Sequence, residues 1–269
     1  MRDSQFEGIG KNLAGSVSVS VTAGVANVKG AWLELVAASA RHAHSIVLEI
    51  GTPTLASPLG FLIDIGIGAS GSEQIIVPNL FYDQRTDNSE SVIYVLRLPF
   101  NIPEGSRVAA RVQCGTASRV QRISAQLVSG VVSEDGIGRV YAYGVNTATS
   151  RGTQVDPGAT AHTKGAWSQI VASSDELDGL FMALGHGPVS STLNSGNLVD
   201  IGIGAAGSEL VIVPNIFVGN SQSGDSLLPA VTDLFRVKIP VGSRLAVRAQ
   251  STNNSATERQ FDVALYGVK

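Results

Sequence analysis

Apolar and polar residues alternate over short stretches along the whole chain, and this alternation predicts half-buried β-strands. Residues 17–21, Val-Ser-Val-Ser-Val, show it most clearly. Turn signals recur about every 8–12 residues between such stretches, and no amphipathic helix of useful length intervenes. Further strands of the first half are predicted at residues 33–37, 45–50, 61–67, 73–77, 92–98, 107–113 and 123–128.

The chain contains an internal duplication. Residues 64–79 recur as residues 200–215, with thirteen of sixteen positions identical and an offset of 136 residues. Shorter matches join 29–32 to 164–167 and 102–113 to 239–250. The repeat predicts two domains, 1–130 and 140–269, joined by a linker at 131–139. Residues 1–9 are predicted as a short arm, and residues 140–144 suit a strand of either domain.

About eight short strands in each half predict an all-β fold of two tandem antiparallel β-sandwich domains. That number suits a jelly roll better than an immunoglobulin domain, and the Cys…Trp…Cys pattern of the latter is absent. Within residues 61–67, Phe61 and Ile63 share the predicted core face, whereas Gly66 leaves the opposite face bare. The second unit, a neighbouring subunit or a larger particle is expected against that face. Pro78 is expected to end the return strand.

Each repeat contains the spacing GxGxxG, from Gly66 and from Gly202, which superficially resembles a dinucleotide fingerprint. That fingerprint requires a helix after the glycines, and here a strand is predicted to follow. The spacing therefore indicates a glycine-rich hairpin, and no cofactor is predicted.

Composition and charge narrow the classes of molecule that this chain is expected to bind. Net charge is −3 and no basic cluster occurs, so nucleic acid is not an expected partner. The single Cys114 excludes an intrachain disulfide framework. No secretory signal and no apolar run of membrane-spanning length is visible, so membrane insertion is not expected. Charged residues make up only 15% of the chain, which fits either a well-packed β protein or a subunit that hides surface in an assembly.

The sequence shows no catalytic constellation and no metal site. Asp64 and Glu73 flank the repeated hairpin and could in principle form an acid pair or a calcium site, but aspartate before a glycine turn more often bonds nearby backbone amides. His42 and His44 share one strand face, yet zinc would need further ligands. Cys114 has no counterpart in the second repeat, where Ser251 takes its place.

Six residues at matching positions are candidates for glycan or subunit contact. The two tryptophans could stack on a sugar or anchor a sandwich core, and the latter is the commoner role of an aromatic side chain. The arginines form outward stripes that suit an acidic glycan, a neighbouring subunit or plain solvent. The six are Trp32, Trp167, Arg107, Arg111, Arg244 and Arg248.

The repeated segments Asp-Ile-Gly-Ile-Gly-Ala-x-Gly-Ser-Glu and Ile-Pro-x-Gly-Ser-Arg-x-Ala-x-Arg-x-Gln resemble those of structural proteins of tailed bacteriophages and gene transfer agents. These include head spikes, fibres and tail-associated attachment proteins. The resemblance covers both units. It implies β-sandwiches without enzymatic activity that assemble on a particle, and some such proteins bind host surface polysaccharide.

On this resemblance, the chain is expected to be a virion component, a spike, fibre, decoration or host-attachment protein, and not an enzyme. The expected partners are other virion proteins, further copies of the chain in a homo-oligomer, and host surface polysaccharide. It would assemble in the host cytoplasm and leave by lysis. The alternative is a carbohydrate-binding protein that recognises host surface polysaccharide through two equivalent modules.

Overall fold

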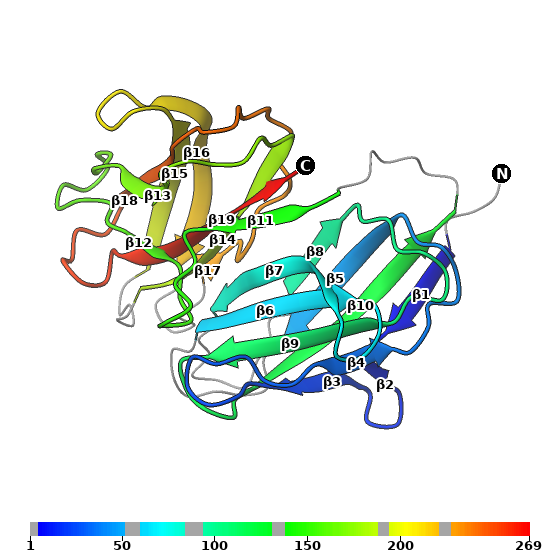
Figure 1. The fold of residues 1–269 in the computed structure, drawn as a ribbon. Helices are drawn as coiled ribbons and strands as arrows, with labels where there is room; N and C mark the ends of the chain where they lie inside the picture. The colour runs from blue at the N-terminus through cyan, green and yellow to red at the C-terminus, as the bar shows by residue number, and fades with distance from the viewer. Residues whose placement is uncertain (1–4, 52–59, 84–93, 131–137, 188–193, 221–226) are drawn as a thin grey trace. The chain divides into compact units, whose positions relative to one another are not determined.

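The structure, a computed structural model, describes residues 5–51, 60–83, 94–130, 138–187, 194–220 and 227–269 (Figure 1). Within these ranges the regular elements are antiparallel β-strands, with no α-helix among them and hence none that could cross a membrane. The chain is all-β and forms two antiparallel β-sandwiches of jelly-roll type, which confirms the predicted fold class. Unit 1 comprises Met1–Pro53, Leu62–Leu80 and Ser91–Val140, and unit 2 comprises Thr54–Phe61, Phe81–Glu90 and Tyr141–Lys269.

Two sheets carry the fold of the first repeat, and Figure 1 shows them as stacked layers. One sheet has the order β2-β3-β10-β5-β8, with β1 also on β10, and the other has the order β4-β9-β6-β7. The strands are β1 (Gln5–Ile9), β2 (Lys11–Asn12), β3 (Val17–Thr22), β4 (Leu33–Val36), β5 (Ser45–Gly51), β6 (Gly60–Ile67), β7 (Gln74–Asp83), β8 (Tyr94–Leu98), β9 (Val108–Cys114) and β10 (Val120–Ser129).

The second repeat is built in the same way. Its sheets have the order β11-β19-β12, with β14 also on β19, and β13-β18-β15-β16-β17. The strands are β11 (Val140–Tyr143), β12 (Thr153–Val155), β13 (Ser168–Val171), β14 (Gly179–His186), β15 (Ser195–Ile203), β16 (Leu210–Asn220), β17 (Leu227–Leu228), β18 (Leu245–Ser251) and β19 (Phe261–Val268).

Alternate side chains of the strands form the core, as the sequence pattern predicts. In unit 1 the inward residues Ile46, Leu48 and Ile50 of β5 are completely buried. In unit 2, Leu180 and Met182 of β14 occupy the corresponding layer of the core. The burial of large aliphatic side chains is the main term that stabilises each sandwich.

The start of the chain differs from the predicted short arm. Residues Gln5–Ile9 form β1, which pairs along β10 from Ser129 to Ala125. Strand β11 lies on β19 in the same way, and the glycine after each strand, Gly10 and Gly144, has positive φ. Thus β11 is the counterpart of β1 and belongs to the second repeat. The predicted linker lies largely outside the described residues, and the predicted domain boundaries stay a prediction.

Pro78 does not end its strand, because β7 continues to Asp83. The second repeat shows why. There Val199 pairs with Ile216 and Ile201 with Val213, so that Pro214 and Asn215 together oppose one residue, Asp200, in a β-bulge. A bulge leaves one residue without a ladder partner, and a proline there forfeits no hydrogen bond.

Candidate functional site

Asp64 lies at the centre of a compact cluster in unit 1. Its Oδ1 accepts hydrogen bonds from Lys29 Nζ at 2.8 Å and from the Asn79 amide at 2.7 Å, and its Oδ2 accepts one from Arg111 Nε at 2.8 Å. Lys29 also donates to the carbonyl of Leu62 at 2.9 Å. The carboxylate is almost fully buried and accepts hydrogen bonds from two cationic side chains and one backbone amide. It therefore links β6, β7 and β9 to one another.

The same arrangement recurs around Asp200 in unit 2. Lys164 Nζ donates to Oδ1 at 2.8 Å, Arg248 Nε donates to Oδ2 at 3.0 Å, and the Asn215 amide donates to Oδ1 at 2.9 Å. Burial opposes ionisation of Asp200, but the hydrogen bonds from Lys164, the Asn215 amide and Arg248 outweigh it and hold the pKa of Asp200 below its usual value.

Trp32 packs into the Asp64 cluster, and Trp167 packs into the Asp200 cluster. The guanidinium of Arg111 lies over the Trp32 ring at 4.5 Å, and that of Arg248 lies over Trp167 at 4.5 Å. Gly66 faces the far edge of the indole so closely that a Cβ there would stand 2.9 Å from Trp32 Cη2. The bare glycine face is therefore filled by a tryptophan of the same unit, and the guanidinium occupies a ring face that a sugar would need.

The remaining two arginines are paired with acids as well. Arg107 Nη1 donates to Glu73 at 2.8 Å and to the carbonyl of Gly68 at 3.3 Å. Arg244 Nη1 donates to Glu209 at 2.7 Å in the second repeat. Both arginines thus fasten the glycine hairpin to the neighbouring strand.

The six residues predicted for glycan or subunit contact occupy matching positions, three in each unit. Arg111 and Arg248 contact the tryptophans, whereas Arg107 and Arg244 pair with acids of the glycine hairpins. Each of these arginines is matched by a carboxylate, which favours a bracing role in the fold. Their predicted contact with a glycan or a subunit stays a prediction. Over the described ranges, no group of three or more His, Cys, Asp or Glu side chains could hold a metal ion.

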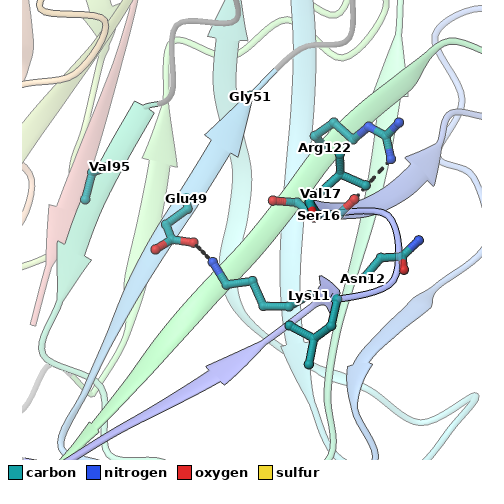
Figure 2. A pocket seen from close by; sticks show the side chains of 10 residues that line it. Lys11, Asn12, Ser16, Val17, Glu49, Gly51, Val95 and Arg122 are labelled. Carbon is teal, nitrogen blue, oxygen red and sulfur yellow. Dashed lines mark hydrogen bonds and ion pairs between the residues drawn. The ribbon is translucent and has the colours of Figure 1, made fainter.

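A separate feature of unit 1 is an open cavity of about 700 Å³ on the sheet that contains β3, β5 and β10. Figure 2 shows Lys11 reaching from β2 to Glu49 on β5, where the two form an ion pair. Ser124 donates a hydrogen bond to Glu49 Oε2 at 2.7 Å. Burial opposes ionisation of Glu49, but the hydrogen bonds from Lys11 and Ser124 prevail, and the pKa of this carboxyl is lowered.

The other side of the cavity carries Arg122, whose Nη1 donates to the carbonyl of Ser18 at 3.1 Å (Figure 2). Apolar side chains complete the lining: Leu13 is 86% exposed, Val95 59% and Val17 41%. The cavity thus combines charged and hydrogen-bonding groups with exposed apolar surface.

The charged residues of this cavity are absent from the second repeat. Ser124 and Asp262 are equivalent on β10 and β19, and they pair with Glu49 and Gly185 respectively. By the same alignment, and from the glycines after β1 and β11, the cavity residues Lys11, Glu49 and Arg122 correspond to Val145, Gly185 and Gln260. At the equivalent positions of the second repeat, Gly185 packs closely against Phe81 and Asp83, and a different ion pair forms between Arg151 and Asp262.

Sequence reasoning missed the cavity, because its residues come from four separate segments of the chain. One signal was available. Lys11, Glu49 and Arg122 are charged in one repeat and uncharged in the other, whereas the residues of the Asp64 and Asp200 clusters are identical in both.

No protein-family model and no curated protein matches the chain. Solved structures that resemble its fold at low similarity include the following three. PNGase F, a glycosylasparaginase from Flavobacterium meningosepticum, is similar at 10% identity and a TM-score of 0.37, over 100% of this chain and 94% of the other. A second structure of PNGase F is similar at 8% identity and a TM-score of 0.38, over 93% and 94% of the two chains. The tandem domain CBM22-1-CBM22-2 of Paenibacillus barcinonensis Xyn10C is similar at 10% identity and a TM-score of 0.29, over 100% and 92%.

These findings correct one expectation. The resemblance to phage structural proteins implies a protein without enzymatic activity, yet two of these three structures are those of an enzyme. The statement that the chain is not an enzyme is therefore wrong as it stood. At these scores the likeness concerns the fold, and it assigns no reaction to this chain.

Proposed function

We propose that the chain is a carbohydrate-binding protein and that unit 1 binds the saccharide in the cavity between Lys11, Glu49 and Arg122. The observation that carries the proposal is the cavity itself, with its three charged residues present in one repeat only. Its volume of about 700 Å³ falls within the range of small-molecule sites. The site thus lies in one unit and not in two equivalent modules.

The lining suits a sugar ring, which presents hydroxyl groups at its rim and C–H groups on its faces. The carboxylate of Glu49 accepts hydrogen bonds, Lys11 donates them, and the exposed amide of Asn12 does both. Val17 and Val95 offer apolar surface to the C–H faces. The ion pair between Lys11 and Glu49 holds both groups in place before a ligand arrives, which lowers the cost of ordering them.

Binding of the purified chain to a panel of bacterial surface polysaccharides tests this proposal. We expect the variant Glu49→Gln to bind at least about tenfold more weakly, because a charged acceptor is lost. Glu104→Gln is the matched control, since Glu104 is exposed in the same unit and does not line the cavity. A panel without any bound saccharide, or equal loss in both variants, would refute the proposal.

A second candidate function is that of a virion component. In that case the polysaccharide that the chain binds would belong to the surface of a host cell. The resemblance of both repeated segments to phage structural proteins supports it, and so do exposed apolar side chains such as Val241 at 74%. Particles prepared with and without the gene would be imaged. Particles that lack a spike or fibre and adsorb poorly would support an attachment role, and unchanged particles would contradict it.

A further inference from the structure

Arg122 holds a charge that no acid of the described chain balances. Among the residues that the structure describes, its guanidinium donates to the Ser18 carbonyl and forms no ion pair with a carboxylate. By contrast, Arg107, Arg111, Arg244 and Arg248 are each paired with an aspartate or glutamate. Arginine in a half-buried position normally pairs its planar fork with a carboxylate or phosphate.

The neighbouring acid is already engaged. Glu49 lies on the same sheet face of β5 as Gly51, but both of its oxygens accept hydrogen bonds, from Lys11 and Ser124 on one and from Gln126 on the other. Gly51 stands directly opposite Arg122 in the register. Because glycine has no side chain, the position opposite Arg122 does not fill the space beside the guanidinium, and both residues line the cavity.

The charges of the cavity therefore do not cancel. Lys11 and Arg122 contribute two positive charges and Glu49 one negative charge, so one positive charge remains on a chain whose net charge is −3. A local excess of positive charge attracts an anionic ligand group. In the second repeat the position of Arg122 is occupied by Gln260, which keeps hydrogen-bonding capacity without the charge.

We propose that the saccharide bound in unit 1 is acidic and that Arg122 recognises its carboxylate. This inference rests on the proposed function, because it names the class of saccharide for the same cavity. The sugar carboxylate receives the guanidinium fork, while Lys11, Glu49 and Asn12 contact hydroxyl groups. Arg122 is thus the residue that determines specificity, and Glu49 serves acidic and neutral sugars alike.

The test compares binding of oligogalacturonate with binding of the same oligosaccharide after its carboxyl groups are reduced to alcohols. We expect the wild-type chain to prefer the acidic form about tenfold or more, and Arg122→Gln, the residue of the second repeat, to lose that preference while keeping weak binding. Arg122→Lys retains the positive charge without the planar fork of the guanidinium. Its preference for the acidic oligosaccharide should lie between those of the wild type and Arg122→Gln. Arg119→Gln removes the same charge outside the cavity and should behave as the wild type.

The outcomes separate this inference from the proposed function. If both forms of the oligosaccharide bind equally and Arg122→Gln changes nothing, the acidic preference is refuted and carbohydrate binding stands. If neither oligosaccharide nor any member of the polysaccharide panel binds, both proposals fail. If dextran sulfate and inorganic polyphosphate compete as well as oligogalacturonate does, the cavity is a general anion site and the inference is wrong.

Discussion

The guanidinium of Arg111 lies over the indole of Trp32 at 4.5 Å, and its Nε donates to Asp64 at 2.8 Å. One arginine thus joins the aromatic ring to the buried carboxylate, and the same pair recurs as Arg248 and Trp167. Because the chain has only these two tryptophans, each is a fluorescent reporter of its own repeat.

Removal of Arg111 should expose Trp32. In a Trp167→Phe background, where only Trp32 emits, Arg111→Ala is expected to shift the emission to longer wavelength and to destabilise the chain by about 2–4 kcal/mol. Arg119→Ala in the same background is the control and should change neither property. Unchanged emission in the Arg111 variant would show that the ring is not covered in solution.

Asp64→Asn should be among the most destabilising single substitutions in unit 1. It leaves Lys29 and Arg111 half-buried without their acid, a loss that typically costs about 3–5 kcal/mol. Asp233→Asn, at an exposed position, should cost less than about 0.5 kcal/mol. Urea denaturation measures both, and a cost for Asp64→Asn similar to that of the control would contradict the bracing role.

Two glycines of one sheet make a matched pair. A Cβ at Gly202 would stand 2.6 Å from Trp167 Cη2, whereas a Cβ at Gly219 would meet no atom within 4 Å. We expect Gly202→Ala to destabilise the chain by about 1–3 kcal/mol. Gly219→Ala should be neutral or stabilising by up to about 1 kcal/mol, because it restricts the unfolded chain. Thermal denaturation distinguishes them, and equal effects would argue against the close approach of Trp167.

Lys29 gives a prediction for alkaline pH. Burial lowers its pKa to about 8, although the hydrogen bond and charge of Asp64 act in the opposite direction. The folded chain therefore loses this proton near pH 8, while the unfolded chain keeps it to about pH 10.5. Between these values the unfolded state binds more protons, so the free energy of unfolding should rise with pH by about 1–3 kcal/mol from this group.

Comparison of the wild type with Lys29→Met isolates that contribution, because the other titrating groups are common to both chains. The difference in unfolding free energy, measured in urea at pH 7 and pH 10, should move in favour of the wild type as pH rises. A constant difference would show that the pKa of Lys29 is not lowered.

Local pattern predicted most of the strands, because alternation of apolar residues reflects burial directly. Local pattern failed where pairing between segments distant in the sequence determines whether a strand forms and where it ends. Residues 5–9 carry little alternation but form β1, since β10 offers them an edge. Pro78 has the appearance of a strand end, because local sequence does not reveal a β-bulge such as the one that the second repeat forms at the equivalent Pro214.

The candidate site shows the same limit. Trp32 and Arg111 could be named from the repeat, but their contact depends on how β9 lies in the sheet. Lys11 and Glu49 are 38 residues apart, and nothing in the local sequence of either indicates the other. Only the comparison of the two repeats singles out these charges, because the second repeat has uncharged residues at the same positions.

The most direct test of carbohydrate binding in unit 1 is an NMR titration that follows the side-chain Nε–H signals of the arginines while oligogalacturonate is added. We expect a saturable shift of Arg122 and of the amide signals of Asn12 and Glu49, with Arg248 unchanged. Shifts confined to Arg111 and Arg248 would place the ligand at the repeated clusters instead. If no arginine signal shifts at saturating ligand, carbohydrate binding in unit 1 is contradicted.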